Sequence, residues 1–214
     1  MKTTIYLIRH AEAEKSENII MDINESEQTF NEKIPLSKAG EYEAKALLHI
    51  KELTNIDCVY SSHYTRAIST ARYISEQSNV PIIVDSRLGE RIMGQTKGID
   101  KSFWLTQMYE KESKCEDGES QSEVQMRMSL FVEEILQKDK GKTIAVFTHA
   151  VAMTFLLMKW CKLEKAELNG KKRWLTYKGK TVINDSFKTT EIFKIIFEDE
   201  SAEDIQRIIS QNKK

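Results

Sequence analysis

Short apolar strands that alternate with helical patterns constrain this fold more than any other feature. Residues 142–148 are the strongest predicted strand, because β-branched, aliphatic and aromatic side chains follow Lys142 without interruption. Similar runs predict further strands at 3–8, 56–60 and 81–84. Helical patterns occupy 37–53, 67–74 and 120–138, and an apolar helix is predicted over 150–160. We therefore predict an α/β fold, a three-layer α/β/α sandwich around a mostly parallel sheet.

The remaining segments carry weaker patterns. Residues 11–33 are polar and too long for an ordinary loop, so we expect them to be functional or partly helical. A helix is predicted over 101–112, with an apolar stripe that includes Trp104 and Met108. We expect this stripe to pack on the core, and a lid over the pocket lined by Phe103, Trp104, Met108 and Tyr109 is the alternative. Two strands are predicted at 173–177 and 189–197, followed by an amphipathic helix from about Ser201. The short basic run 171–173 is expected to be solvated surface.

Composition narrows the classes of function. The 214 residues suffice for one domain, 1–214, and a net charge of −1 gives no basic field that would favour nucleic acid. No apolar run is long enough to span a membrane. The three cysteines are far apart and lack metal-ligand spacing, which disfavours a disulfide framework or a zinc site. We therefore expect a cytoplasmic protein.

Polar residues of catalytic type follow three of the predicted strands. Arg9 and His10 end the first strand, and His149 ends the strand at 142–148. The second strand ends at Ser61-Ser62, with Arg66 one turn into the following helix. Because ligands bind at the carboxyl ends of parallel strands, we expect two arginines and two histidines along one edge.

This set of side chains suits phosphoryl transfer. Arginine forks and helix N-termini bind phosphate oxygens, while one imidazole can act as a neutral nucleophile and the other can donate as a cation. Glu90, just after the third strand, could protonate the leaving oxygen.

Six motifs in order give the chain a resemblance to the histidine phosphatase superfamily, the phosphoglycerate-mutase-like proteins, over nearly its full length. They are Leu7-Ile8-Arg9-His10, Pro35-Leu36-Ser37 with Gly40, Ser61-Ser62 with Arg66-Ala67, Leu88-Gly89-Glu90, Gly118-Glu119-Ser120 and Phe147-Thr148-His149. Two positions depart from the family pattern: Ala11 and Ala150 stand where glycine is common. Ser16 stands where the family places an asparagine, so a phosphate contact from Ser16 or from Asn18 is not expected.

The resemblance implies a role for each matched residue. His10 would carry the phosphoryl group, while Arg9, Arg66 and His149 would bind its oxygens, and Glu90 would be the proton donor. The substrate-binding set would also include Ser37, Ser62 and Arg91, the last for a second anionic group. No metal and no cofactor are implied, because side chains supply the positive charge.

Three alternatives stay open. A metallohydrolase that uses His10 and His149 as ligands is disfavoured, because Arg9 and Arg66 would repel a cation. A non-catalytic phospholigand-binding protein is a second alternative, and a cofactor-dependent phosphoglycerate mutase is a third. The short segment 95–117 favours a phosphatase over a mutase. We thus expect a histidine phosphatase of the acid or alkaline type, acting on a small phosphorylated metabolite, with neither nucleic acid nor membrane as partner and a homodimer left open.

Overall fold

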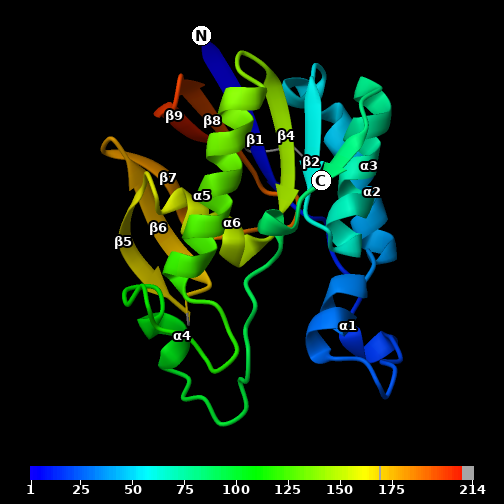
Figure 1. Ribbon diagram of the computed structural model, residues 1–214, viewed down its shortest axis with the longest axis vertical. Coiled ribbons are helices and arrows are strands. Elements are labelled where there is room, and N and C mark those ends of the chain that lie inside the picture. Colours follow the sequence, from blue (N-terminus) through cyan, green and yellow to red (C-terminus); the bar gives the residue numbers. More distant parts are fainter. Residues whose placement is uncertain (169, 209–214) are drawn as a thin grey trace.

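A six-stranded sheet forms the centre of the computed structural model, which describes residues 1–168 and 170–208 (Figure 1). Its strands stand in the order β3-β2-β4-β1-β8-β9. Their bounds are β1 Lys2–Arg9, β2 Cys58–Ser61, β3 Ile82–Val84, β4 Thr143–Thr148, β8 Ile192–Glu198 and β9 Ser201–Ile208. Strands β3, β2, β4 and β1 run parallel, whereas β8 and β9 pair antiparallel at one edge. The predicted mostly parallel sheet is confirmed.

Helices cover both faces of this sheet (Figure 1). They are α2 Lys38–Ala46, α3 Thr65–Ser78, α5 Gln121–Lys138 and α6 Ala150–Leu157. Alternate side chains of a strand point to opposite faces, so β1 contributes to two cores. Ile5 and Leu7 belong to the cluster that contains the apolar side chains of α5 and α6, and Tyr6 and Ile8 to the cluster that contains those of α3. The predicted α/β fold is confirmed. None of the described helices is both long and apolar enough to cross a membrane.

A separate three-stranded antiparallel sheet lies beside α5 and consists of β5 Lys162–Glu167, β6 Lys172–Tyr177 and β7 Lys180–Ser186 (Figure 1). Only β6 was predicted. In β5 a register shift between Leu163 and Lys165 places two residues between the inward side chains of Leu163 and Ala166. In β7 a second shift buries the adjacent Val182 and Ile183. These bulges break the alternation by which a strand is recognised.

The predicted helix from Ser201 is wrong, because this segment is strand β9. A two-residue turn follows β8, and Glu198 pairs with Ser201. Phe197 pairs with Ala202, but Ile196 pairs with Asp204, so one residue of β9 is extra. This bulge turns both Ala202 and Ile205 toward the core, and a spacing of three mimics a helical stripe.

Three further predictions are confirmed in part. Residues 11–33 contain a 3₁₀ turn at Ser16–Asn18 and the helix α1 Glu27–Lys33, so the segment is partly helical. The helix predicted over 101–112 shrinks to α4 Phe103–Thr106, followed by turns. The predicted helix over 37–53 is α2 followed by 3₁₀ turns at Leu47–His49 and Lys51–Leu53.

Gly40 fixes the start of α2 against the loop that follows His10. A Cβ atom at Gly40 would overlap the backbone carbonyl of Glu12. The Ser37 N–H donates to that same carbonyl at 3.0 Å, and the Ser37 Oγ donates to the Glu12 carboxylate at 2.6 Å. The helix therefore needs glycine here for a close approach of two backbones.

Gly40→Ala tests this contact, because two effects on stability oppose each other. Helix propensity alone would raise the free energy of unfolding by about 1 kcal/mol, whereas overpacking against Glu12 lowers it by roughly 1–3 kcal/mol. We expect a net loss of stability in urea unfolding. Lys38→Ala, at an exposed position of the same turn, serves as control and should change stability little. A more stable Gly40→Ala protein would contradict the close approach.

Candidate active site

The ends of β1, β4 and β2 bring the predicted residues together. Arg9 pairs with Thr148, and the N–H of His10 donates to the Thr148 carbonyl at 2.9 Å. The Ser62 N–H donates to the Phe147 carbonyl at 2.9 Å on the other side of β4. As a result, the rings of His10 and His149 lie with their centroids 5.0 Å apart.

His10 is held with one nitrogen available as a nucleophile. Its Nδ1 lies 2.7 Å from the carbonyl oxygen of Ala11, which can only accept a hydrogen bond, so Nδ1 carries the proton. The lone pair is then on Nε2, which accepts from the Nε–H of Arg66 at 3.2 Å. The ring is buried, with 8% of its surface exposed.

Burial and two neighbouring cations keep His10 neutral. The pKa of His10 is lowered to about 3, mainly by burial and also by the charges of Arg66 and Arg9. The hydrogen bond with the Ala11 carbonyl acts in the opposite direction. A neutral imidazole keeps the Nε2 lone pair that nucleophilic attack needs.

His149 lies fully buried beside His10 as the residue that precedes α6. Its Nε2 is 2.9 Å from the Oγ of Ser62, and its ring packs against Tyr64 with centroids 4.5 Å apart. Burial, with positive charge nearby, lowers the pKa of His149 well below its usual value. The cationic histidine expected from the sequence is thus not favoured in the ligand-free site, and a bound dianion would be needed to stabilise it.

Arg9 and Arg66 are anchored by backbone carbonyls rather than by carboxylates. The Nη1 of Arg9 donates to the carbonyl of Phe187 at 2.8 Å, and the Nη1 of Arg66 donates to that of Asn31 at 2.6 Å. Asn31 belongs to α1, so the polar segment 11–33 reaches the site. Burial lowers the pKa of both arginines, and the charge of Glu90 partly offsets this shift.

Glu90 sits at the N-terminus of α6. Its Oε1 accepts hydrogen bonds from the backbone N–H groups of Arg91 and Ala152, both at 2.9 Å. Its Oε2 has a single long contact, 3.3 Å from the N–H of Val151. Oε2 is therefore the oxygen that is free to exchange a proton with a bound molecule.

The structure separates the other predicted substrate-binding residues. Ser62 lies in the site through its contact with His149. The side chain of Ser37 instead caps α2 by accepting from the Gly40 N–H at 3.0 Å and donating to Glu12. Arg91 is buried, donates from Nε to the Glu119 carbonyl at 2.6 Å and lines a pocket next to Glu90.

Arg173 is a residue that the sequence did not single out, and its expected place on the solvated surface is wrong. Arg173 lies in strand β6 and is buried, with 6% of its surface exposed. Burial lowers the pKa of Arg173, the charge of Glu90 raises it, and the charge of Arg9 lowers it. The basic run 171–173 gave no sign of this, because the alternation of a strand turns Arg173 inward between Lys172 and Trp174.

Among the described residues, no group of three or more His, Cys, Asp or Glu side chains is placed to hold a metal ion. The cations in the site are the guanidinium groups of Arg9 and Arg66.

Comparisons with known proteins identify the family. A model of the histidine phosphatase superfamily, branch 1, matches residues 5–179, and the chain belongs to this superfamily. A probable phosphatase of Schizosaccharomyces pombe is 32% identical over 73% of this chain and 56% of its own length. Phosphoserine phosphatase 1 of Hydrogenobacter thermophilus is 28% identical over 63% of this chain and 66% of its own length. The chain thus spans between half and two thirds of these relatives.

The fold has solved counterparts. A mycobacterial glucosyl-3-phosphoglycerate phosphatase superposes with a TM-score of 0.70 at 16% identity and covers 98% of both chains. Other relatives and solved structures are named phosphoglycerate mutases. The phosphoglycerate-mutase-like architecture predicted for the chain is confirmed.

The depressed pKa of His10 predicts how stability depends on pH. Between pH 6.5 and about 3 the unfolded histidine binds a proton that the folded one does not, so folding stability falls as the pH is lowered through this window. In His10→Ala the fall should be shallower by up to about 1.4 kcal/mol per pH unit. Urea unfolding across the window measures the slope, with the exposed His49→Ala as control. Equal slopes in wild type and His10→Ala would show that His10 is not buried as described.

Proposed function

We propose that this protein is a phosphomonoester phosphatase that acts on a small phosphorylated metabolite through a phosphohistidine intermediate on His10. One observation carries the proposal: the Nε2 lone pair of a neutral, buried His10 already faces the guanidinium of Arg66. A phosphoryl group placed there would meet a nucleophile and a bound cation at once. Membership of the histidine phosphatase superfamily supports the same reaction.

In the first step His10 takes the phosphoryl group. The Nε2 lone pair forms a bond to phosphorus, and the bond from phosphorus to the leaving oxygen breaks. Glu90, in its protonated form, gives its proton to that oxygen, so that an alcohol departs. The ring gains positive charge, which the carbonyl of Ala11 stabilises through the proton on Nδ1. When the substrate binds, the Nε–H of Arg66 must exchange its hydrogen-bond acceptor, His10 Nε2, for a phosphoryl oxygen. Substrate binding thereby frees the Nε2 lone pair for attack.

In the second step water releases the phosphate. Glu90, now a carboxylate, takes a proton from the water as the water oxygen bonds to phosphorus. The bond from phosphorus to Nε2 breaks, and its electron pair returns to His10. Arg9, Arg66 and His149 surround the phosphoryl oxygens in both transition states, and a phosphoryl dianion favours the protonated form of His149.

We also propose that the reaction needs no metal ion. The guanidinium groups of Arg9 and Arg66 lie next to the nucleophile, and their charge would repel a divalent cation. Those same groups provide the charge stabilisation that phosphoryl transfer demands.

His10→Ala is expected to lower the hydrolysis of 4-nitrophenyl phosphate by at least about a thousandfold, because the nucleophile is removed. Assays are run in EDTA, where the wild-type protein should keep full activity. His49→Ala is the matched histidine control and should behave as wild type. Rapid quenching of wild type with ³²P-labelled substrate in alkaline detergent should trap phosphate on the protein that is stable to base and released by acid. Full activity of His10→Ala would end the proposal, and transfer of the label to 3-phosphoglycerate instead of water would identify a mutase.

Glu90→Gln tests the proton donor through its dependence on the leaving group. The alkoxide that leaves from an alkyl phosphate is a strong base and needs a proton. For an alkyl phosphate we therefore expect kcat/KM to fall about 10²–10⁴-fold. 4-Nitrophenolate needs no proton, so 4-nitrophenyl phosphate should lose much less in the first step. Burst kinetics with the nitrophenyl ester separate this step from hydrolysis of the intermediate. Equal losses on both esters in the first step would assign proton donation to another group.

A further inference from the structure

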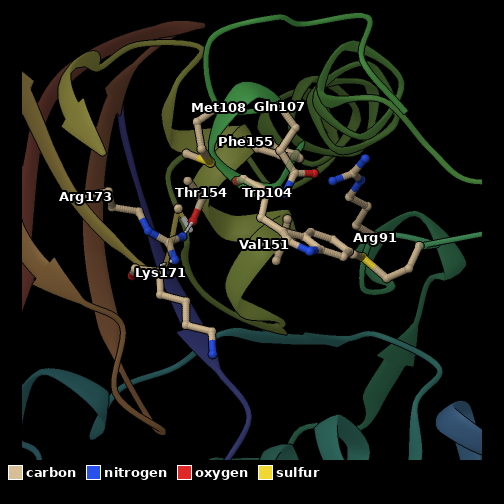
Figure 2. Close-up of a pocket in the computed structure, with 11 residues that line it drawn as sticks. Arg91, Trp104, Gln107, Met108, Val151, Thr154, Phe155, Lys171 and Arg173 are labelled. Carbon is tan, nitrogen blue, oxygen red and sulfur yellow. Dashed lines mark hydrogen bonds between the residues drawn. The ribbon is translucent and has the colours of Figure 1, made fainter. Parts of the chain in front are cut away.

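A pocket of about 410 Å³ lies next to Glu90 and is not used by the steps above (Figure 2). Its size falls within the range of small-molecule sites in proteins. Val151 lines it and also donates its backbone N–H to Glu90 Oε2. Arg91, the neighbour of Glu90 in sequence, forms part of the wall. The pocket therefore begins on the side of Glu90 where the group that receives its proton would lie.

A second connection joins the pocket to the phosphate-binding residues. The backbone carbonyl of Phe187 accepts the hydrogen bond from Arg9, and the ring of Phe187 lies under the guanidinium of Arg173 at 4.6 Å. Arg173 lines the pocket. A molecule whose phosphoryl group reaches Arg9 can thus place its remainder against Arg173.

Large apolar side chains make up most of the wall. Trp104, Met108 and Phe155 are among the lining residues, and Figure 2 shows the indole of Trp104 between Arg91 and Arg173. Trp104 comes from the short helix α4, within the segment 95–117. The flat indole face favours a planar, apolar body in the ligand.

One end of the pocket is strongly basic. Arg173 is held by the Thr154 hydroxyl and by the Lys171 carbonyl, so its position is fixed. Its Nε is buried without a hydrogen-bond partner among the described residues, and no described carboxylate forms an ion pair with it. Burial lowers the pKa of Arg173 to about 10, which leaves it charged at neutral pH. Lys171 lines the same end. A buried charge with no counter-ion is costly, and an anionic ligand would remove that cost.

We propose that this pocket is the leaving-group subsite, that it takes an aromatic body carrying a carboxylate, and that Arg173 is the specificity-determining residue that binds the carboxylate. The preferred substrate is then a phosphomonoester of a planar hydroxy acid. This assignment rests on the proposed phosphatase function.

Two aryl phosphates that differ only in charge test the subsite. 4-Carboxyphenyl phosphate has an acid where 4-carbamoylphenyl phosphate has a neutral amide of the same shape. In wild type we expect kcat/KM to favour the acid by about tenfold or more, since hydrogen bonds to charged groups are worth that much. Arg173→Gln should abolish the preference, and Arg173→Lys should keep part of it. The ratio is taken within one protein, so a partly unfolded variant leaves it unchanged.

Lys172→Gln is the matched control. Lys172 neighbours Arg173 on β6, but its ammonium lies over the ring of Trp174, away from the pocket. The variant removes a positive charge of the same strand and should keep the wild-type ratio. A wild-type ratio near one, or a preference that survives in Arg173→Gln, would overturn the subsite.

Binding of the leaving groups alone separates this proposal from the proposed function. Calorimetry on His10→Ala with 4-hydroxybenzoate and 4-hydroxybenzamide needs no turnover. The acid should bind at least about tenfold more tightly, and Arg173→Gln in the same background should remove the difference. Trp104→Ala should weaken both ligands and keep their ratio. Preferential binding in a protein without phosphatase activity would overturn the function and leave the subsite standing, whereas turnover without preference would overturn only the subsite.

Discussion

The parallel pairing of β1 with β4 is the constraint on which the rest of the structure depends. Its register, from Thr4 with Thr143 to Arg9 with Thr148, places His10 and His149 at adjacent strand ends. A slip of one residue would turn Ile5 and Leu7 away from their core and reverse every side chain of β1. The same register therefore buries the apolar core and aligns the two imidazoles, so core packing maintains the geometry of the site.

Near the two imidazoles, positively charged side chains outnumber negatively charged ones. Arg66 and Arg173 are buried and Arg9 is half-buried, and in each case the Glu90 carboxylate offsets part of the cost of that burial. Glu43 and Glu191 also act on Arg9, whereas Glu90 is the carboxylate that acts on both Arg66 and Arg173. The ligand-free site is consequently short of negative charge, which a phosphoryl dianion and a further acid would supply. Backbone carbonyls, such as that of Phe187, hold the arginines in position without neutralising them.

Sequence reasoning succeeded where local chemistry repeats a simple rule. The parallel strands follow continuous apolar runs, and the residues at their ends, such as His10 and Ser62, meet because parallel strands end at one edge. Sequence reasoning failed at β5, β7 and β9, because a bulge in the pairing of each strand changes the spacing of its inward side chains. Arg173 was missed for a related reason: whether a basic residue faces water or the interior depends on strand pairing, which a run of three cations does not reveal.

The three-stranded sheet lies between α6 and β8 in the chain, and within the described residues β5, β6 and β7 pair only with one another. The proposed nucleophile and the residues proposed to bind phosphate come from the six-stranded sheet and its helices, whereas Arg173 comes from this appended unit. Reactivity and selectivity would then occupy different modules of one fold. Mutational drift in the appended sheet could redirect the enzyme toward a new alcohol while the phosphorus chemistry is inherited intact.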